Sequence, residues 1–103
     1  MADKRVKLIV TYDIYDDDSQ TYYQYMIGEF LPKAQSMGLV LLDALHTVYG
    51  DYPARLLSFA ARDRATLEAI LGRADWRQLE DKLKTYVTDY QRKVVPYRDR
   101  FQF

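Results

Sequence analysis

Residues 6–14 read VKLIVTYDI, and this stretch has the period of two that is typical of a β-strand. Five further segments follow along the chain, and the hydrophobic period identifies each as a helix or a strand. The later segments are 23–37 (helix), 39–49 and 54–61 (strands), 65–87 (helix) and 90–95 (strand). This order predicts an α+β fold, the βαββαβ arrangement of ferredoxin-like domains with a four-stranded antiparallel sheet. Both helices would then cover one sheet face and leave the other without a helix.

Alternation along the first strand divides its side chains between these two faces. The continuous apolar set, which we expect to contact the helices, is Val6, Leu8, Val10, Tyr12 and Ile14. The mixed set, expected on the helix-free face, is Lys7, Ile9, Thr11, Asp13 and Tyr15. Leu41, Leu45 and Tyr49 of the second strand would extend the helix-free face. Such a surface is too apolar for a soluble monomer, so the sequence predicts a homodimer whose two sheets enclose an α/β barrel.

The first helix is predicted to bury one stripe at steps of four and three residues: Tyr23, Ile27, Phe30, Ala34 and Met37. Pro32 lacks the amide that would bond to the carbonyl of Gly28, so we expect a kink there. Asp16, Asp17 and Asp18 precede this helix and are expected to cap it, and Gly38 should end it in a left-handed conformation.

The second helical stretch is predicted to consist of two segments. Asp63 is expected to cap the first of these, which Gly72 ends. Asp75 with Gln78 resembles a capping box, so the second segment should begin at Trp76. Its apolar stripe comprises Trp76, Leu79, Leu83 and Tyr86. We expect Trp76 to be a buried structural anchor.

Composition excludes several classes of function. The 103 residues predict one domain over 1–103, and the 15 basic and 15 acidic residues balance. A zero net charge argues against non-specific nucleic-acid binding and against attraction to anionic membranes. With no cysteine, the chain forms no disulfide and no Cys-ligated metal site. No apolar signal segment or membrane-length stretch is present, so a cytoplasmic location is expected.

The common catalytic motifs are absent, including G-x-G-x-x-G, G-x-x-x-x-G-K, H-x-x-x-H and G-x-S-x-G. The single histidine, His46, is a candidate general base or hydrogen-bond donor. The alternative interpretation is that His46 has a structural role near the sheet edge. The segment 54–61 has one aromatic residue and no glycine, unlike the third strand of RNA-binding βαββαβ modules. We predict no nucleic-acid partner, no metal and no cofactor.

Two acidic residues within strands, Asp13 and Asp43, are unusual because aspartate is depleted in strands and costly when buried alone. The candidate pocket on the helix-free face comprises Thr11, Asp13, Asp43, Thr47 and Tyr49, with His46 nearby. Exposure near strand ends is the alternative for the two acids. These five residues share one face only if the odd-numbered positions of both strands point to the same side of the sheet. His46 would then point toward the helices, so the pocket and His46 are alternative candidate sites and do not form one site.

Several spacings carry a resemblance to a known family. Leu31-Pro32 lies six residues before Gly38, and Gly38-Leu39-Val40-Leu41 enters a strand that ends at Gly50. A helix follows Asp63, and Ala74-Asp75-Trp76 precedes the Leu79, Leu83 and Tyr86 stripe. In these features the chain resembles the dimeric α/β-barrel superfamily and, within it, NIPSNAP-like domains. It departs from the family at Val10, where an arginine often precedes the Thr-Tyr pair.

The resemblance implies a homodimer, and the superfamily includes cofactor-free monooxygenases, haem-handling enzymes, isomerases and proteins of unknown activity. Because one fold hosts many chemistries, it does not select among them. The predicted function is a homodimeric binding or accessory protein that holds a small apolar or aromatic ligand. The alternative is a cofactor-independent monooxygenase or isomerase in which His46, Asp13, Asp43 or a tyrosine acts as acid or base.

Overall fold

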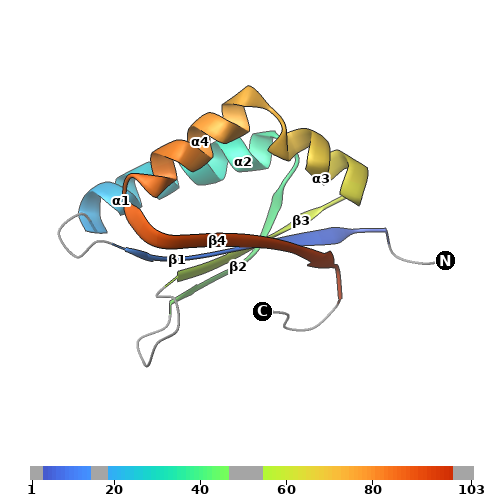
Figure 1. Cartoon of the computed structure of the whole chain (residues 1–103), viewed down its shortest axis with the longest axis horizontal. Coiled ribbons are helices and arrows are strands. Elements are labelled where there is room, and N and C mark those ends of the chain that lie inside the picture. Colours follow the sequence, from blue (N-terminus) through green and yellow to red (C-terminus); the bar gives the residue numbers. More distant parts are fainter. Residues whose placement is uncertain (1–3, 15–18, 47–54, 99–103) are drawn as a thin grey trace.

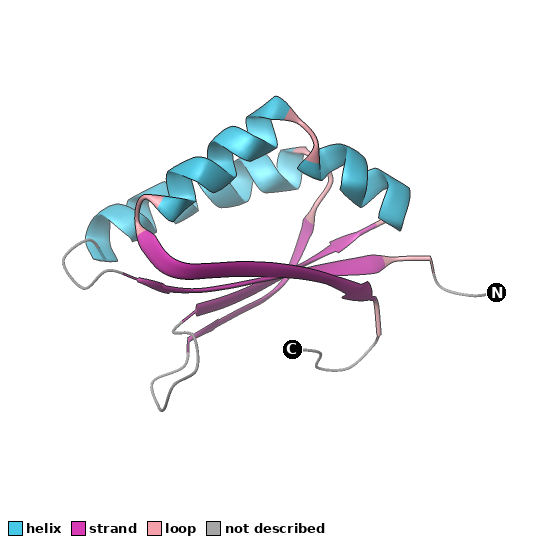
Figure 2. Ribbon diagram, in the orientation of Figure 1, coloured by secondary structure: helices cyan, strands magenta, loops and turns pink. Residues whose placement is uncertain are grey.

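The computed structural model of the chain describes residues 4–14, 19–46 and 55–98. In chain order the elements are β1 (Val6–Ile14), α1 (Ser19–Tyr25), η2 (Met26–Phe30), α2 (Leu31–Ser36), β2 (Val40–His46), β3 (Arg55–Ala61), α3 (Arg64–Leu71), α4 (Ala74–Lys84) and β4 (Val87–Pro96). The strands form one antiparallel sheet in the order β2-β3-β1-β4. All helices lie on one face of it (Figures 1 and 2). The predicted α+β, ferredoxin-like fold is therefore confirmed.

The central strand β1 divides its side chains as its period of two predicts. Val6, Leu8, Val10 and Tyr12 are buried in the core beneath the helices. In register on β3, Phe59 lies opposite Leu8 and Leu57 opposite Val10, and both are buried in the same core. The apolar face of the sheet thus comes from strands adjacent in space, and the helices cover it.

The predicted buried stripe of the first helix is correct only in its second half. Phe30 and Ala34 are buried, but Tyr23 is 42% exposed and Ile27 is 69% exposed. The upstream residues that enter the core instead are Tyr22, Tyr25 and Met26. The prediction assumed 3.6 residues per turn throughout, and the structure departs from that spacing.

The cause is η2, a π-helical turn between α1 and α2. The amide of Leu31 donates to the carbonyl of Met26, five residues back, so one turn holds an extra residue. This extra residue rotates the upstream helix by about one position. Pro32, which has no amide to donate, follows directly, so the irregularity expected there takes the form of a π turn. Gly38 ends α2 with φ of 107°, as predicted.

The helix-capping predictions have mixed outcomes. Asp63 accepts a hydrogen bond from the Thr66 amide at 2.7 Å and caps α3 as expected. The capping-box prediction is wrong: α4 begins at Ala74, and its N-cap residue is Arg73. Asp75 lies in the first turn and forms an ion pair with Arg73 at 2.8 Å. The predicted caps at residues 16–18 and the hairpin turn at residues 50–53 lie outside the described residues.

The second strand also differs from the prediction. A register shift between Leu41 and Asp43 places Leu41 opposite Phe59, on the helix side, where it packs against the core. Leu41 was expected on the helix-free face together with Leu45, but an extra residue in a β-bulge reverses the side-chain alternation. Leu45, beyond the bulge, lies opposite Leu56 on the helix-free side. Tyr49 lies outside the described residues.

Trp76 is fully buried, which confirms its predicted place in the core, and its ring lies 5.7 Å from that of Phe30. We expect Trp76→Ala to lower the free energy of unfolding by about 3–5 kcal/mol, since it removes a large buried side chain and leaves a cavity. Denaturant unfolding followed by circular dichroism measures the change.

Arg77→Ala, at an exposed position of the same helix, is the matched control and should change stability by less than about 0.5 kcal/mol. If Trp76→Ala does not fold, Trp76→Phe should still fold with an intermediate loss. Equal stability of the Trp76→Ala and Arg77→Ala proteins would contradict the prediction.

Candidate functional site

Of the predicted pocket residues, the two acids Asp13 and Asp43 lie apart within one chain. Asp43 lies opposite Ser58, and its Oδ2 accepts a hydrogen bond from the Ser58 hydroxyl at 2.8 Å. Ser58 is fully buried, so this bond satisfies a polar group inside the sheet. Asp43 therefore has a structural partner within its own sheet.

Asp13 lies on the same face but far from Asp43. Asp13 pairs with Thr88 of β4, whereas Ser58, the partner of Asp43, pairs with Ile9. Four residues along β1 and two strand spacings separate the acids by roughly 16 Å. Thr11 is half-buried between them, opposite Leu56. Thr47 and Tyr49 lie outside the described residues.

His46 points to the other side of the sheet. It lies opposite Arg55, which in turn lies opposite the core residue Tyr12, so His46 and Arg55 both belong to the helix side. This matches the predicted alternation, in which Asp43 and His46 face opposite ways. His46 is exposed because β2 is an edge strand.

A groove of about 270 Å³ runs between the edge strand β2 and the first helix; we call it the His46 groove. Its apolar walls are Met26, Ile27 and Leu31 from the helix and Ala44, Leu45 and Leu57 from the strands. Its polar residues are Tyr22, Tyr23, His46 and Arg55. The π turn explains this wall, because the shift that buries Tyr22 and Met26 also turns Tyr23 and Ile27 outward toward β2. Such turns are common at functional sites.

The polar residues of the groove form contacts with one another. Arg55 donates a hydrogen bond to the Tyr23 hydroxyl, and its guanidinium carbon lies 5.5 Å from the centre of the Tyr23 ring. The hydroxyls of Tyr22 and Tyr12 share a hydrogen bond beneath them, in the core. Burial raises the pKa of Tyr12 far above its ordinary value, and it raises the pKa of Tyr22 as well. These two phenols therefore stay neutral, and the groove has an uncharged floor.

This arrangement can orient a small molecule and can perform acid–base chemistry on it. A histidine is suited to proton transfer near neutral pH, and a guanidinium stabilises a developing negative charge. Sequence reasoning singled out His46 but missed Tyr23 and Arg55. Alignment of β2 with β3 places Arg55 opposite His46, so this pairing could have indicated Arg55 as a site residue. The helix rotation that exposes Tyr23 has no signal in the hydrophobic pattern of the sequence.

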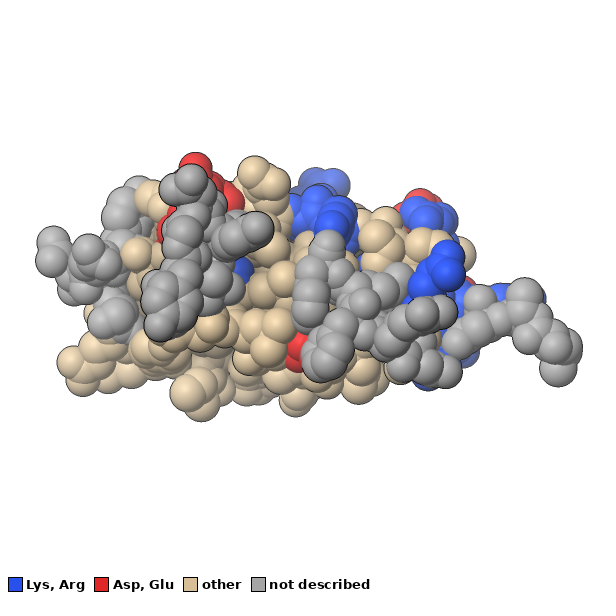
Figure 3. Space-filling model, turned by 90° about the horizontal axis from the view of Figure 1, so that it is seen from below, with Lys and Arg blue, Asp and Glu red and all other residues tan. Residues whose placement is uncertain are grey.

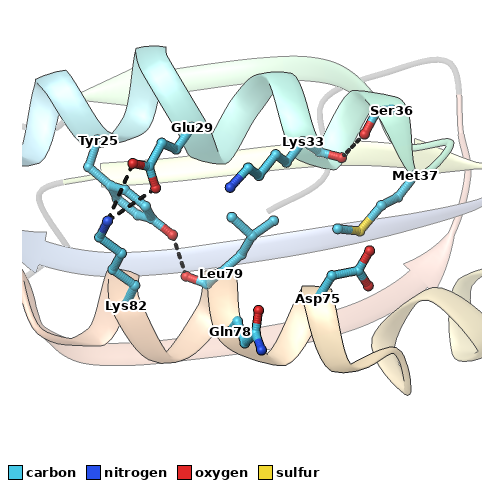
Figure 4. A pocket seen from close by; sticks show the side chains of 9 residues that line it. All are labelled: Tyr25, Glu29, Lys33, Ser36, Met37, Asp75, Gln78, Leu79 and Lys82. Atoms are coloured by element: carbon cyan, nitrogen blue, oxygen red, sulfur yellow. Dashed lines mark hydrogen bonds and ion pairs between the residues drawn. The ribbon is translucent and has the colours of Figure 1, made fainter.

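A second groove, of about 460 Å³, lies on the outer surface between the first helix and α4 (Figure 4). Glu29 and Lys82 form an ion pair across it at 3.1 Å, and the Tyr25 hydroxyl donates to the Leu79 carbonyl at 2.5 Å. Lys33 and Asp75 extend over the same groove from opposite helices (Figure 4). The contacts join two helices, and exposed ion pairs contribute little stability. We assign this groove a structural role.

No metal-binding cluster of three or more His, Cys, Asp or Glu side chains occurs in residues 4–14, 19–46 and 55–98. In the same part of the chain, no helix combines the length and the apolar character needed to cross a membrane.

No protein-family model and no curated protein matches the sequence. Solved structures do match. An uncharacterised NIPSNAP-like domain protein from Burkholderia xenovorans superposes with a TM-score of 0.68 and 16% identity, over 98% of this chain and 91% of that one. A putative antibiotic biosynthesis monooxygenase from Nitrosomonas europaea has a TM-score of 0.65 and 19% identity, over 94% and 91%. The hydroxynitrile lyase from Passiflora edulis has a TM-score of 0.74 and 11% identity, over 98% and 100%.

The predicted resemblance to NIPSNAP-like domains is thus confirmed as a likeness of fold. At these identities the likeness extends to the arrangement of helices and strands alone. The neighbours differ in their described activities, which agrees with the principle that function depends on the site rather than on the fold.

The buried tyrosines predict an alkaline unfolding transition. Burial raises the pKa of Tyr12, Tyr22, Tyr25 and Tyr90 above the ordinary value of about 10. The unfolded chain would therefore ionise first, and the stabilisation, fully present below pH 10, should be lost as the pH rises above it. Absorbance at 295 nm should show exposed tyrosines ionising reversibly near pH 10 and buried ones only when circular dichroism reports unfolding.

Tyr12→Phe removes one of the buried tyrosines whose pKa is raised by folding. The free energy of unfolding of this variant should therefore fall less steeply above pH 10. If all tyrosines ionised in one step near pH 10 while the fold persisted, the proposed burial would be wrong.

Proposed function

We propose that this protein is a homodimeric small-ligand-binding or accessory protein of the α/β-barrel type, and that its ligand lies in the His46 groove. The observation that carries the proposal is a largely apolar groove with Tyr23, His46 and Arg55 together at one end. An apolar cleft with a few convergent polar groups is the usual form of a small-molecule site.

The size of the groove limits the ligand. Its volume of about 270 Å³ lies just below the ~300–1,000 Å³ of sites for drug-sized molecules. One or two rings, or an equivalent aliphatic body, would fill it. Contacts with Ile27, Leu31 and Ala44 favour an apolar or aromatic body, at about 25 cal/mol for each Å² removed from water. The groups at the polar end would orient one oxygen-bearing substituent.

Two solved structures with this fold support a small-molecule function by analogy. One is described as a putative antibiotic biosynthesis monooxygenase and the other as a hydroxynitrile lyase. The balance of 15 basic and 15 acidic residues argues against a nucleic-acid or membrane partner. The absence of cysteine fits the reducing cytoplasm, where we expect the protein to act.

A second candidate function is a cofactor-independent monooxygenase or isomerase acting in the same groove. The position of His46 next to Arg55 favours it, because a base and a cation could act on one substrate. His46 would remove a proton from the substrate, and Arg55 would stabilise the anion that forms. His46→Gln separates the two functions: a binding protein should keep its ligand, whereas an enzyme should bind substrate but lose turnover.

Homodimerisation rests on the helix-free face. Val40 is 59% exposed at the edge of this face, Leu45 is 39% exposed, and Leu56 beside it is half-buried. Figure 3 shows that much of the visible described surface on this side carries no charge. A second copy packed face to face, with two-fold symmetry, would cover this apolar surface.

Ligand binding should depend on the walls of the His46 groove. Ile27→Glu places a carboxylate in the groove at an exposed position, so folding should be unaffected while binding of a monocyclic aromatic compound weakens at least about tenfold. Amide shifts in a ¹H–¹⁵N NMR titration measure binding, and native mass spectrometry tests for a co-purified molecule. Val40→Glu, a similarly exposed apolar position outside the groove, is the matched control. Equal affinity of both variants would place the ligand elsewhere.

Sedimentation equilibrium at micromolar concentration should give twice the 12.2 kDa mass of the chain. Val40→Glu should shift the protein toward the monomer, since it places a charge within the apolar surface that the second copy covers. Ile27→Glu, on the helix side, should leave the dimer intact. A 12.2 kDa species alone would contradict the homodimer and leave the groove proposal standing.

A further inference from the structure

A lysine lies on an inner strand near one end of the sheet, on the face opposite the helices. Lys7 belongs to the inner strand β1, between Ala60 of β3 and Val95 of β4. Lys7 is only 3% exposed, and Ile9, next on the same face, is 1% exposed. Lysine is almost never fully buried without a partner, so this position needs an explanation.

The partners of the Lys7 ammonium are few. Within the described ranges its only interaction is with the ring of Tyr97, whose centre lies 5.7 Å away. The ammonium itself keeps contact with solvent, because among the described residues only the Trp76 indole nitrogen is both fully buried and without a partner. This contact is small, because the whole residue is only 3% exposed, and the ammonium has therefore lost most of its water.

The contact with the Tyr97 ring does not offset the free-energy cost of burying the Lys7 ammonium. A cation–π contact contributes about 0.5–2 kcal/mol. Removing an ammonium from most of its water costs several kcal/mol unless a counter-charge is present. The same ring already contacts a second cation, since the guanidinium carbon of Arg5 lies 4.0 Å from its centre. The arrangement therefore favours an anion next to Lys7.

We propose that Lys7 anchors an oxyanion-binding site on the helix-free face, which takes the carboxylate or phosphate group of a small organic acid. The ammonium would donate charge-assisted hydrogen bonds to the anion, and the half-buried Val95 would contact the apolar part of the ligand. Basic side chains gather toward one end of this face (Figure 3). Lys93, opposite Ile9, lies on it as well, although the proposal needs only Lys7.

This site is distinct from the His46 groove. Lys7 and His46 lie on opposite faces of the sheet. The Lys7 site lies within one chain and does not require the dimer. In the proposed homodimer, the same face would line the space between the two sheets, where an enclosed anion would interact more strongly with the ammonium.

The test uses 2-naphthoate, whose fluorescence reports binding, beside neutral 2-naphthylmethanol and inorganic phosphate. Lys7→Met, which keeps the length of the side chain and removes its charge, should weaken naphthoate binding at least about tenfold. It should leave binding of the neutral alcohol within about twofold, and Lys7→Arg should retain most of the affinity for naphthoate. Lys33→Met, an exposed lysine of α2, is the matched control.

The outcomes separate this site from the groove. Dependence of naphthoate binding on Lys7 but not on Ile27→Glu supports the proposal. Binding of phosphate alone, again dependent on Lys7, supports it with a phosphate group as the ligand. No binding of either anion, or equal binding by Lys7→Met, would overturn it. If Lys7→Met does not fold, the ¹³Cε resonance of Lys7 in the wild-type protein should shift on titration, and an unchanged resonance would overturn the proposal.

Discussion

The extra residue in the turn Met26–Phe30 determines how the first helix meets the sheet. Since Leu31 bonds five residues back and Pro32 offers no amide, the helix upstream is rotated relative to α2. Tyr22 and Met26 enter the core as a result, while Ile27 turns outward. The buried hydroxyl pair of Tyr12 and Tyr22 and the wall of the His46 groove both follow from this single backbone change.

The two faces of the sheet differ in how their polar groups are satisfied. On the helix side, polar atoms bond to one another across elements: Glu80 of α4 accepts from the Tyr90 hydroxyl at 2.7 Å and from Arg92 at 2.6 Å. The other face carries isolated polar groups among apolar ones, with Asp43 bonded to Ser58 and Lys7 next to a ring. On the helix-covered face most polar groups are therefore satisfied internally, with the Trp76 indole nitrogen an exception among the described residues, whereas the uncovered face can also be contacted by ligands or by a second copy.

The fold does not decide the chemistry. Neighbours with the same arrangement include a NIPSNAP-like protein, a putative monooxygenase and a hydroxynitrile lyase, at 11–19% identity. The features of this chain that bear on function are local: one histidine on an edge strand beside Arg55, and a buried lysine on the opposite face. Function must therefore be argued from these side chains.

The sequence by itself determined the order of elements, the apolar face of β1, the cap at Asp63 and the burial of Trp76, because each depends on local periodicity or on one residue type. It also placed Asp43 and His46 on opposite faces, since alternation holds beyond the bulge. Tertiary structure decided the rest. The bulge at Leu41–Asp43 and the π turn each add one residue where packing requires it, and a single added residue reverses a strand face or rotates a helix stripe. Contacts between Tyr23 and Arg55, or Lys7 and Tyr97, join residues far apart in sequence, so only the folded chain brings them together.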